Sequence, residues 1–340
     1  MKIIYSKKHN QHAPPYQFLG GRPAPYPEVP ERAERVLQAL NAQGFTEVVF
    51  SRAFAPDAVR AVHDPGYLHY LEHVHAAWVD AGGTSAAGLI PDTFAMRTVR
   101  GKPDTLIYQA GYYCFETQTP ILEGTYEAAL ASAGCALIGA ELLLEGERAA
   151  YALCRPPGHH AGWDVYGGYC YLNNAAIAAA QLSREGRVAI LDVDFHHGNG
   201  TQDIFYGSNE VLFVSIHADP NRKYPYFSGF ADEEGQGEGR GFSRNFPLEA
   251  GVDEARYLEV LDRALDAVHA FGPAFFVVSL GVDTCQGDPL GDFELSLEAF
   301  THIGERLGQM GLPTLLAQEG GYDLETVGTC VGNVLQAFDR

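Results

Sequence analysis

Short apolar runs alternate with helical stretches through the second half of this 340-residue chain. The clearest helical stretches span residues 174–184 and 253–271. The apolar runs, which are typical of buried strands, span residues 149–153, 188–192, 211–216, 275–280 and 314–317. Strands that alternate with helices predict a parallel sheet covered by helices on both faces. The sequence therefore predicts an α/β, doubly wound fold with a mostly parallel sheet.

The first part of the chain is less regular. Strands are expected at residues 1–6 and 46–50, helices at 31–42 and 124–145, and a long loop rich in Pro and Gly at 7–30. Glycines and prolines break any periodicity in residues 80–122, which we expect to form an irregular insertion that serves as a lid, a dimer contact or a substrate wall. Because no linker or repeat interrupts the chain, residues 1–340 are expected to form a single domain.

Each of the five apolar runs leads into an unusual group of polar residues. These groups lie at residues 154–160, 192–197, 215–217, 281–283 and 319–322. In parallel sheets, ligands bind beyond the carboxyl ends of the strands. We therefore expect the five groups to meet at one edge of the sheet and to form an active site.

The group that follows residues 188–191 has the spacing of a metal site. Asp192, Asp194 and His196 occupy alternate positions, and alternate side chains of an extended chain share one face. Three polar groups on one face of an apolar strand are costly to bury, and a divalent cation would neutralise them. A strand end that turns into a polar loop is the alternative. The second histidine and the Gly-Asn-Gly turn that follow at once favour the metal site.

Asp283, after a neighbouring run, would complete a ligand set with Asp194 and His196. This set supplies two carboxylates and one imidazole. A catalytic zinc site keeps three protein ligands and an open position for water or substrate. Two carboxylates make the metal a weaker Lewis acid than three imidazoles would, so additional polarising groups would be useful.

Such groups are present after the other runs. His159 and His160 are candidates for proton transfer, and Asp192 could orient one of the two imidazoles. Tyr322, in a Gly-Gly-Tyr turn, could direct its phenol towards a developing oxyanion. A tandem histidine pair alone could be structural, but the metal-competent cluster on a neighbouring strand favours catalysis.

The charge of the chain limits its partners. Asp and Glu number 43 against 23 Lys and Arg, which gives a formal net charge of −20 and a pI near 4.9. Such a field repels phosphate backbones and attracts cationic small molecules or basic peptides, so we expect no nucleic-acid binding. Adaptation to salt or simple solubility would produce the same charge.

Cysteine use and hydropathy indicate a cytoplasmic protein. The six cysteines are widely spread without a C-x-x-C pair, which matches neither a zinc knuckle nor a disulfide framework. The N-terminal residues predict a short strand rather than a signal peptide, and no run approaches the roughly 18 apolar residues of a membrane span. We therefore expect buried thiols, a cytoplasmic location and no membrane contact.

Five motifs resemble the signature set of the histone deacetylase superfamily, and most closely that of its bacterial acetylpolyamine amidohydrolase branch. They are Arg155-Pro-Pro-Gly-His-His-Ala161, Gly167-Gly-Tyr-Cys-Tyr-Leu-Asn-Asn174, Asp192-Val-Asp-Phe-His-His-Gly-Asn-Gly-Thr201, Ser279-Leu-Gly-Val-Asp283 and Glu319-Gly-Gly-Tyr322. The resemblance implies the arginase-deacetylase fold, a single catalytic zinc and hydrolysis of the amide of a small N-acylated amine.

The resemblance implies the same zinc ligands, histidine pair and tyrosine as the reasoning above. It adds Tyr169 and Tyr224 as aromatic walls of a tunnel for an acyl-lysine-like chain, with Gly168 beside them as a substrate contact. It also implies a structural potassium site. The residues that match this site are Asp192, Asp194, His196, Ser215 and Ile216, the last largely through its backbone.

The metal count distinguishes two families that share this fold. Arginase-like ureohydrolases hold two manganese ions through Asp-x-His-x-Asp on this strand and Asp-x-Asp on the later one. Here the positions of the second-metal ligands are Gly198, which offers no ligand, and Cys285, whose thiol suits a hard, oxygen-rich manganese site poorly. One metal per chain is therefore the better interpretation. Asn199 stands where many family members carry an aspartate partner for His160, so His160 should be less basic than His159.

The substrate is less constrained. Polyamine-specific members place carboxylates near the tunnel mouth, but Gln17, Ile107 and Gln118 occupy the positions where glutamates are expected. Glu116, close by in the sequence, or acids of a partner subunit in an expected homodimer could replace them. Two enzymatic alternatives remain: a deacetylase of small acylated amines such as acetylpolyamines, and a broader deacetylase of acetyl-lysine peptides or other amides. A non-catalytic binding module would need a broken site, and the motifs are intact.

Overall fold

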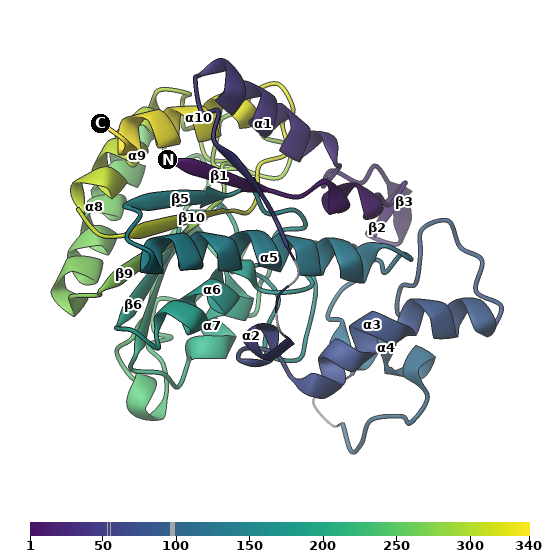
Figure 1. Ribbon diagram of the computed structural model, residues 1–340. Coiled ribbons are helices and arrows are strands. Elements are labelled where there is room, and N and C mark those ends of the chain that lie inside the picture. Colours follow the sequence, from purple (N-terminus) through teal and green to yellow (C-terminus); the bar gives the residue numbers. More distant parts are fainter. Residues whose placement is uncertain (53, 55, 96–98) are drawn as a thin grey trace.

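An eight-stranded sheet lies at the centre of the described chain, which comprises residues 1–52, 54, 56–95 and 99–340 of a computed structural model (Figure 1). In the order β4-β1-β5-β10-β9-β6-β7-β8, every neighbouring pair of strands is parallel. The strands are β1 (Lys2–Tyr5), β4 (Val48–Phe50), β5 (Ala149–Ala152), β6 (Val188–Asp192), β7 (Val211–Ala218), β8 (Ser243–Leu248), β9 (Phe275–Leu280) and β10 (Thr314–Gln318). All the strands predicted from the sequence are present, and the predicted fold class is confirmed.

Helices cover both faces of this sheet (Figure 1). One face carries α5 (Thr125–Leu144), α6 (Asn174–Leu182) and α7 (Asn199–Phe205). The other carries α1 (Glu31–Ala42), α8 (Glu254–Phe271), α9 (Ala299–Gln309) and α10 (Val327–Phe338). Successive side chains of a strand point to opposite faces, so Ile190 packs in the core under α5 and α6, whereas Leu191 packs in the core under α8 to α10.

Helix α5 is the exception to the expectation that no segment is long and apolar enough for a membrane. It meets the length and composition of a span, alone among the helices of the described residues, but 72% of its apolar window is buried inside the molecule. A helix that is hydrophobic on all sides is typical of the core of a large protein. The apolar composition of α5 is therefore explained by its central position against β1, β5 and β10.

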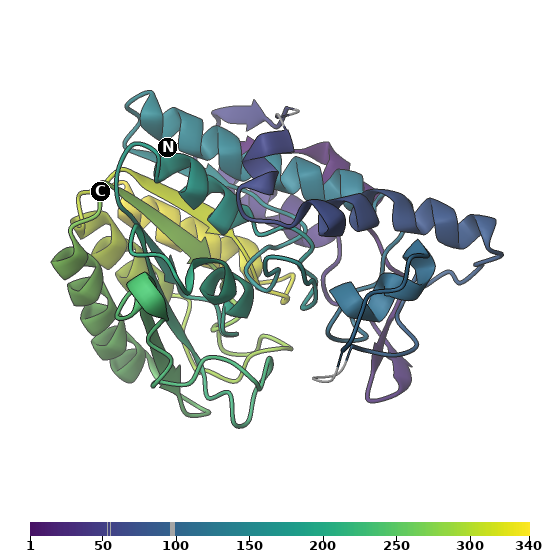
Figure 2. The same ribbon diagram turned by 90° about the horizontal axis from the view of Figure 1, so that it is seen from below.

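The first third of the chain builds a smaller layer beside the sheet. It contains η1 (Lys7–Gln11), the antiparallel hairpin β2 (Gln17–Leu19) and β3 (Arg22–Ala24), α2 (Pro56–Arg60), α3 (Pro65–Asp80), η2 (Leu106–Gln109) and α4 (Ala110–Tyr113). Helices α3 and α4 extend away from the sheet in both views (Figures 1 and 2). Between residues 80 and 122 the described structure is mostly irregular, as predicted, and its buried part contributes Tyr113 to a third core with Tyr67 and Tyr70.

The strand register brings the polar groups to one edge of the sheet. Asp192, at the end of β6, is aligned with Ser215 of β7 on one side and with Ser279 of β9 on the other. Ala317 of β10 is in turn aligned with Ser279 and with Ala152 of β5. The segments that follow these strands therefore leave the sheet side by side.

Candidate active site

Three potential metal ligands converge beyond the ends of β6 and β9. His196 Nδ1 lies 3.3 Å from Asp194 Oδ1 and 3.0 Å from Asp283 Oδ2. One donor atom from each residue lies within 4.8 Å of the others. Both carboxylates are fully buried, whereas His196 keeps a small exposed fraction of 13%.

The charges of this cluster fit a divalent cation. Burial, together with the charge of Asp194, raises the pKa of Asp283 to about 7. Burial opposes protonation of His196, but its hydrogen bonds to Asp194 and Asp283 prevail and raise its pKa to about 9. The negative charges of two buried carboxylates are poorly neutralised by one imidazole, which can carry only one positive charge. A zinc ion, which accepts such oxygen and nitrogen donors, would neutralise them.

The histidine pair lies beside this cluster on the segment that follows β5. His159 Nδ1 is 3.0 Å from Asp192 Oδ2, whereas His160 Nδ1 is 2.7 Å from Asn199 Oδ1. Burial opposes the charge of His159, but Asp194 and Asp192 raise its pKa to about 10. Burial and the positive charges of His159 and His196 hold the pKa of His160 well below its usual value. His160 is therefore the less basic of the two histidines because of its burial and its cationic neighbours.

Glu319 fixes the turn that carries the two histidines. Its Oε2 accepts hydrogen bonds from the backbone N–H groups of Gly158, at 2.6 Å, and His159, at 3.1 Å. Burial raises the pKa of this carboxyl to about 7, because few charges compensate it. Donor atoms of Glu319, His159 and Cys170 form a second fully buried group. Since His159 and Glu319 are already engaged with Asp192 and the backbone, we interpret this group as support for the histidine turn.

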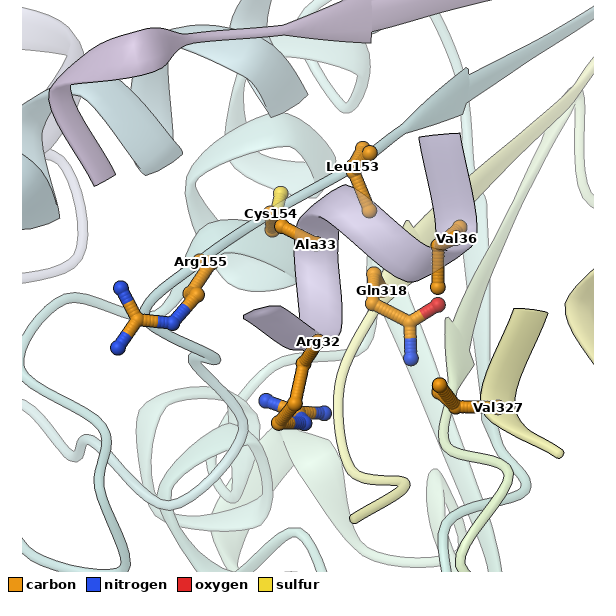
Figure 3. Close-up of a pocket in the computed structure, with 8 residues that line it drawn as sticks. All are labelled: Arg32, Ala33, Val36, Leu153, Cys154, Arg155, Gln318 and Val327. Atoms are coloured by element: carbon orange, nitrogen blue, oxygen red, sulfur yellow. The ribbon is translucent and has the colours of Figure 1, made fainter. Parts of the chain in front are cut away.

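Tyr322 is held over the cluster by residues that the sequence does not single out. Its backbone N–H donates to Asp288 Oδ2 at 2.6 Å, and the guanidinium of Arg32 lies 4.6 Å from the centre of its ring. Arg32 also donates to the carbonyls of Glu319 and Gly321, and it forms a 2.7 Å ion pair with Glu28. Arg32 lines a small cavity between α1 and the residues that follow β5 (Figure 3).

Arg32, Glu28 and Asp288 are functional residues that sequence reasoning misses. Arg32 belongs to a predicted amphipathic helix, next to Ala33 on its buried side. An arginine on an apolar face indicates a buried ion pair, and its partner Glu28 lies only four residues earlier. The carbonyls that Arg32 also binds, however, belong to a segment 287 to 289 residues away. No local pattern in the sequence identifies them.

The Gly168–Tyr169 turn lies against both halves of the catalytic machinery. Gly168 has φ +57° and Tyr169 has φ +66°, a conformation that favours glycine. A Cβ atom on Gly168 would lie 2.1 Å from Cδ2 of His160. The Tyr169 ring lies 5.9 Å from that of Tyr322, and its hydroxyl donates to Gln17 Oε1 at 2.9 Å.

Tyr224 lies against the histidine pair and the metal cluster. Its ring centre lies 5.0 Å from that of His160 and 6.1 Å from that of His196. Phe115, which sequence reasoning misses, stacks against Tyr224 at 6.1 Å. Tyr169 therefore lies beside Tyr322, and Tyr224 lies beside the histidine pair.

With this geometry in place, comparisons with known proteins decide the family. The histone deacetylase domain family matches residues 26–338. This chain belongs to the histone deacetylase family. It is 45% identical to acetylpolyamine amidohydrolase 2 of Pseudomonas aeruginosa, over 100% of this chain and 99% of that protein. It is 43% identical to the acetylpolyamine amidohydrolase of Mycoplana ramosa, over 99% of each chain.

A solved structure agrees with these relatives. The acetylpolyamine aminohydrolase of Burkholderia pseudomallei superposes on this deacetylase-family chain with a TM-score of 0.95 and 40% identity, covering 99% of this chain and 98% of the other. The resemblance that the motifs indicated is confirmed. Since the coverage is nearly complete in both chains, the likeness includes the irregular segment at residues 80–122.

Within this deacetylase fold, the expected mouth residues do not supply free carboxylates. Gln17 is buried, and its Nε2 donates to the Pro25 carbonyl at 3.0 Å while its Oε1 accepts from Tyr169. Gln118 is half-buried. Glu116 accepts hydrogen bonds from the backbone N–H of Gln118, from a threonine hydroxyl and, at 3.3 Å, from the Gly168 N–H. Glu116 therefore fixes its own loop and is not free to replace the missing glutamates.

Proposed function

We propose that this chain is a zinc-dependent deacetylase that hydrolyses the amide of small N-acetylated amines, with acetylpolyamines as its substrate class. The convergence of Asp194, His196 and Asp283 beside the histidine pair carries this proposal. The full-length likeness to proteins named acetylpolyamine amidohydrolases supports the substrate class. When bound, the zinc ion would polarise the amide carbonyl and lower the pKa of a water molecule.

The protein's own groups move the proton. Asn199 Oδ1 can only accept, so His160 Nδ1 carries the hydrogen that it donates, and His160 Nε2 has a free lone pair. With its low pKa, His160 is neutral and can take a proton from the attacking water at Nε2, then return it to the leaving amine. His159, kept charged by Asp194 and Asp192, stabilises developing negative charge without exchanging a proton.

Tyr322 completes the site as a hydrogen-bond donor. Burial raises its pKa well above the usual value, so the phenol remains protonated at neutral pH. Asp288 holds the backbone of this tyrosine through a hydrogen bond, and the guanidinium of Arg32 packs on its ring. The hydroxyl can therefore donate to the carbonyl oxygen of the substrate as it gains negative charge. Tyr169 and Tyr224 would exclude water from the acyl chain.

We propose one zinc per chain. At Gly198, where a second ligand would be required, a Cβ would lie 2.1 Å from Asp192 Oδ2, so this position has no space for a side chain. The Cys285 thiol is engaged with Cys330 and with a backbone carbonyl. Two metals per chain by elemental analysis would contradict this stoichiometry and support a ureohydrolase-like centre.

We also propose a structural potassium ion near Asp192. Asp192 and Ser215 are aligned in neighbouring strands, both fully buried, and Ile216 follows on β7. Asp194 and His196 would complete the site that the family resemblance implies. Thermal unfolding in potassium chloride, compared with choline chloride at equal ionic strength, tests this site. Equal midpoints in the two salts would count against it.

A broader deacetylase of acetyl-lysine peptides is the second candidate, because Gln17 carries no carboxylate and Glu116 is engaged in its own loop, so neither can hold a distal ammonium. Acetate release from N-acetylputrescine, N-acetylcadaverine, N-acetylspermidine and an acetyl-lysine peptide distinguishes the two candidates. Preference for the peptide would contradict the small-amine proposal.

We further propose a homodimer in which residues 80–122 narrow the entrance. A monomer in sedimentation that deacetylates folded histones would contradict this proposal.

A further inference from the structure

A surface cavity of about 350 Å³ lies at the edge of the sheet opposite the active site. Its walls come from the amino ends of strands and the carboxyl end of a helix. Arg187 precedes β6, Arg244 is the second residue of β8, and Phe271 is the last residue of α8. Arg240 and Phe242 close the remaining side. In a parallel sheet, the amino ends of strands lie opposite their carboxyl ends, so this cavity is separate from the zinc cluster.

Three arginines gather here although the chain is strongly acidic. Acidic residues number 43 against 23 basic ones. Among the residues that the structure describes, no carboxylate oxygen lies within 4.0 Å of Arg187, Arg240 or Arg244. The positive charge of this cavity is therefore not neutralised by a direct ion pair.

Aromatic rings hold one of the arginines in place. The guanidinium of Arg187 lies 4.1 Å from the centre of the Phe271 ring and 5.8 Å from that of Phe242. Its Nη1 also donates to the Phe271 carbonyl at 3.3 Å. Binding to the end of α8 is a sufficient structural reason for Arg187, since cations stabilise the carboxyl ends of helices. It gives no reason for Arg240 and Arg244, which are exposed and line the same cavity.

From this arrangement we infer that the cavity binds a small phosphate-bearing molecule. Guanidinium groups match the oxygens of a phosphate with paired hydrogen bonds, and they are the preferred side chains for this recognition. The volume is at the lower end of the range for small-molecule sites, which suits a phosphate with one compact apolar or aromatic group beside Phe242 and Phe271. A nucleic acid is disfavoured, because the net charge of −20 repels an extended phosphate backbone.

Titration calorimetry on the zinc-loaded enzyme tests this site. Inorganic phosphate and adenosine 5′-monophosphate serve as the two probes, at a constant ionic strength of about 0.15 M because exposed charges are screened by salt. Arg240→Gln and Arg244→Gln remove charge but leave the contact between Arg187 and α8 intact. Arg184→Gln is the matched control: Arg184 is exposed, lies three residues before Arg187 and does not line the cavity.

Saturable binding of at least one probe is expected, and each cavity substitution should weaken it about tenfold or more, the usual effect of losing a hydrogen bond to a charged group. Arg184→Gln should retain the affinity within about twofold. Binding of the nucleotide but not of inorganic phosphate would assign a contribution to the apolar wall. The inference is overturned if neither probe shows saturable binding, or if Arg184→Gln weakens binding as much as the cavity substitutions do. It is also overturned if the variant with both Arg240→Gln and Arg244→Gln still binds the probe, because binding would then be at the zinc. Deacetylation should be unchanged in both cavity variants.

Discussion

Gly168→Ala is expected to inactivate the enzyme by displacing His160 while the fold survives. The Cβ of the new alanine would lie 2.1 Å from Cδ2 of His160, whereas ordinary contact begins at 3.4 Å, so the imidazole must move by roughly 1.3 Å. That movement stretches the 2.7 Å contact between His160 Nδ1 and Asn199. Misplacing a catalytic group by about 1 Å typically costs a factor of about 100 in rate.

The hairpin between β2 and β3 offers a matched control. Gly20 has φ +57°, the same as Gly168, but a Cβ built on Gly20 meets nothing within 4 Å. Both alanine variants carry the backbone strain of a left-handed residue, about 1–2 kcal/mol. In a chain of this size that strain lowers the melting temperature by only a few degrees. The steric displacement of His160 is therefore the difference between the two variants.

The assay combines kcat for N-acetylputrescine, zinc content and thermal unfolding. Gly168→Ala should lose about 100-fold in kcat with zinc retained, and Gly20→Ala should remain within about twofold of the parent. Both melting temperatures should fall by a few degrees, that of Gly168→Ala by more because displacing a packed side chain adds strain. A kcat for Gly168→Ala within a few-fold of the parent would refute the role given to His160, and an equal loss in Gly20→Ala would show that backbone strain alone is responsible.

Three further substitutions separate the roles of the remaining groups. Tyr322→Phe should lower kcat by about two to three orders of magnitude with zinc retained, because only the oxyanion donor is lost; near-normal turnover would exclude that role. Asn199→Asp should raise the pKa of His160 by placing a carboxylate at its Nδ1, so the acidic limb of the kcat/KM profile should move to higher pH, and an unchanged profile would contradict proton transfer by this histidine. Gln118→Glu should raise the preference for an acetylated diamine over a neutral acetamide of equal length by several-fold, and no change would show that residue 118 does not contact the distal end.

The parallel sheet could be predicted from the sequence because its central strands are buried on both faces. Ile190 and Leu191 pack into opposite cores, so apolar residues are continuous along β6. Two other elements were not predictable in this way. Strand β8 contains Pro247 and several polar residues, which an edge strand tolerates, and the β2–β3 hairpin lies within a stretch that is rich in proline.

In the site, too, contacts between residues close in the sequence could be predicted, whereas contacts between residues far apart in the sequence could not. The alternate spacing predicts that Asp192, Asp194 and His196 share one face of an extended strand, but β6 ends at Asp192, so that expectation is wrong for Asp194 and His196. These two residues meet in the bend that follows, where the His196 N–H donates to Asp194 Oδ1 at 2.8 Å, so their proximity is still a local feature. The hydrogen bonds of Arg32 to the carbonyls of Glu319 and Gly321, and that of the Gly168 N–H to Glu116, depend on contacts across the fold. The residues that form the chemistry are therefore more visible in the sequence than those that position them or determine the substrate.

Metal titration of the apoenzyme tests the central claim most directly. Protein freed of metal by a chelator is supplied with increasing zinc, and acetate release from N-acetylputrescine is measured at each step, with Asp283→Asn as the variant that lacks one ligand. Activity should rise linearly and reach its plateau at one zinc per chain, and Asp283→Asn should stay inactive at that ratio. A plateau only at two zinc ions per chain, or no acetate release at any ratio, would contradict a single-zinc deacetylase centre at Asp194, His196 and Asp283.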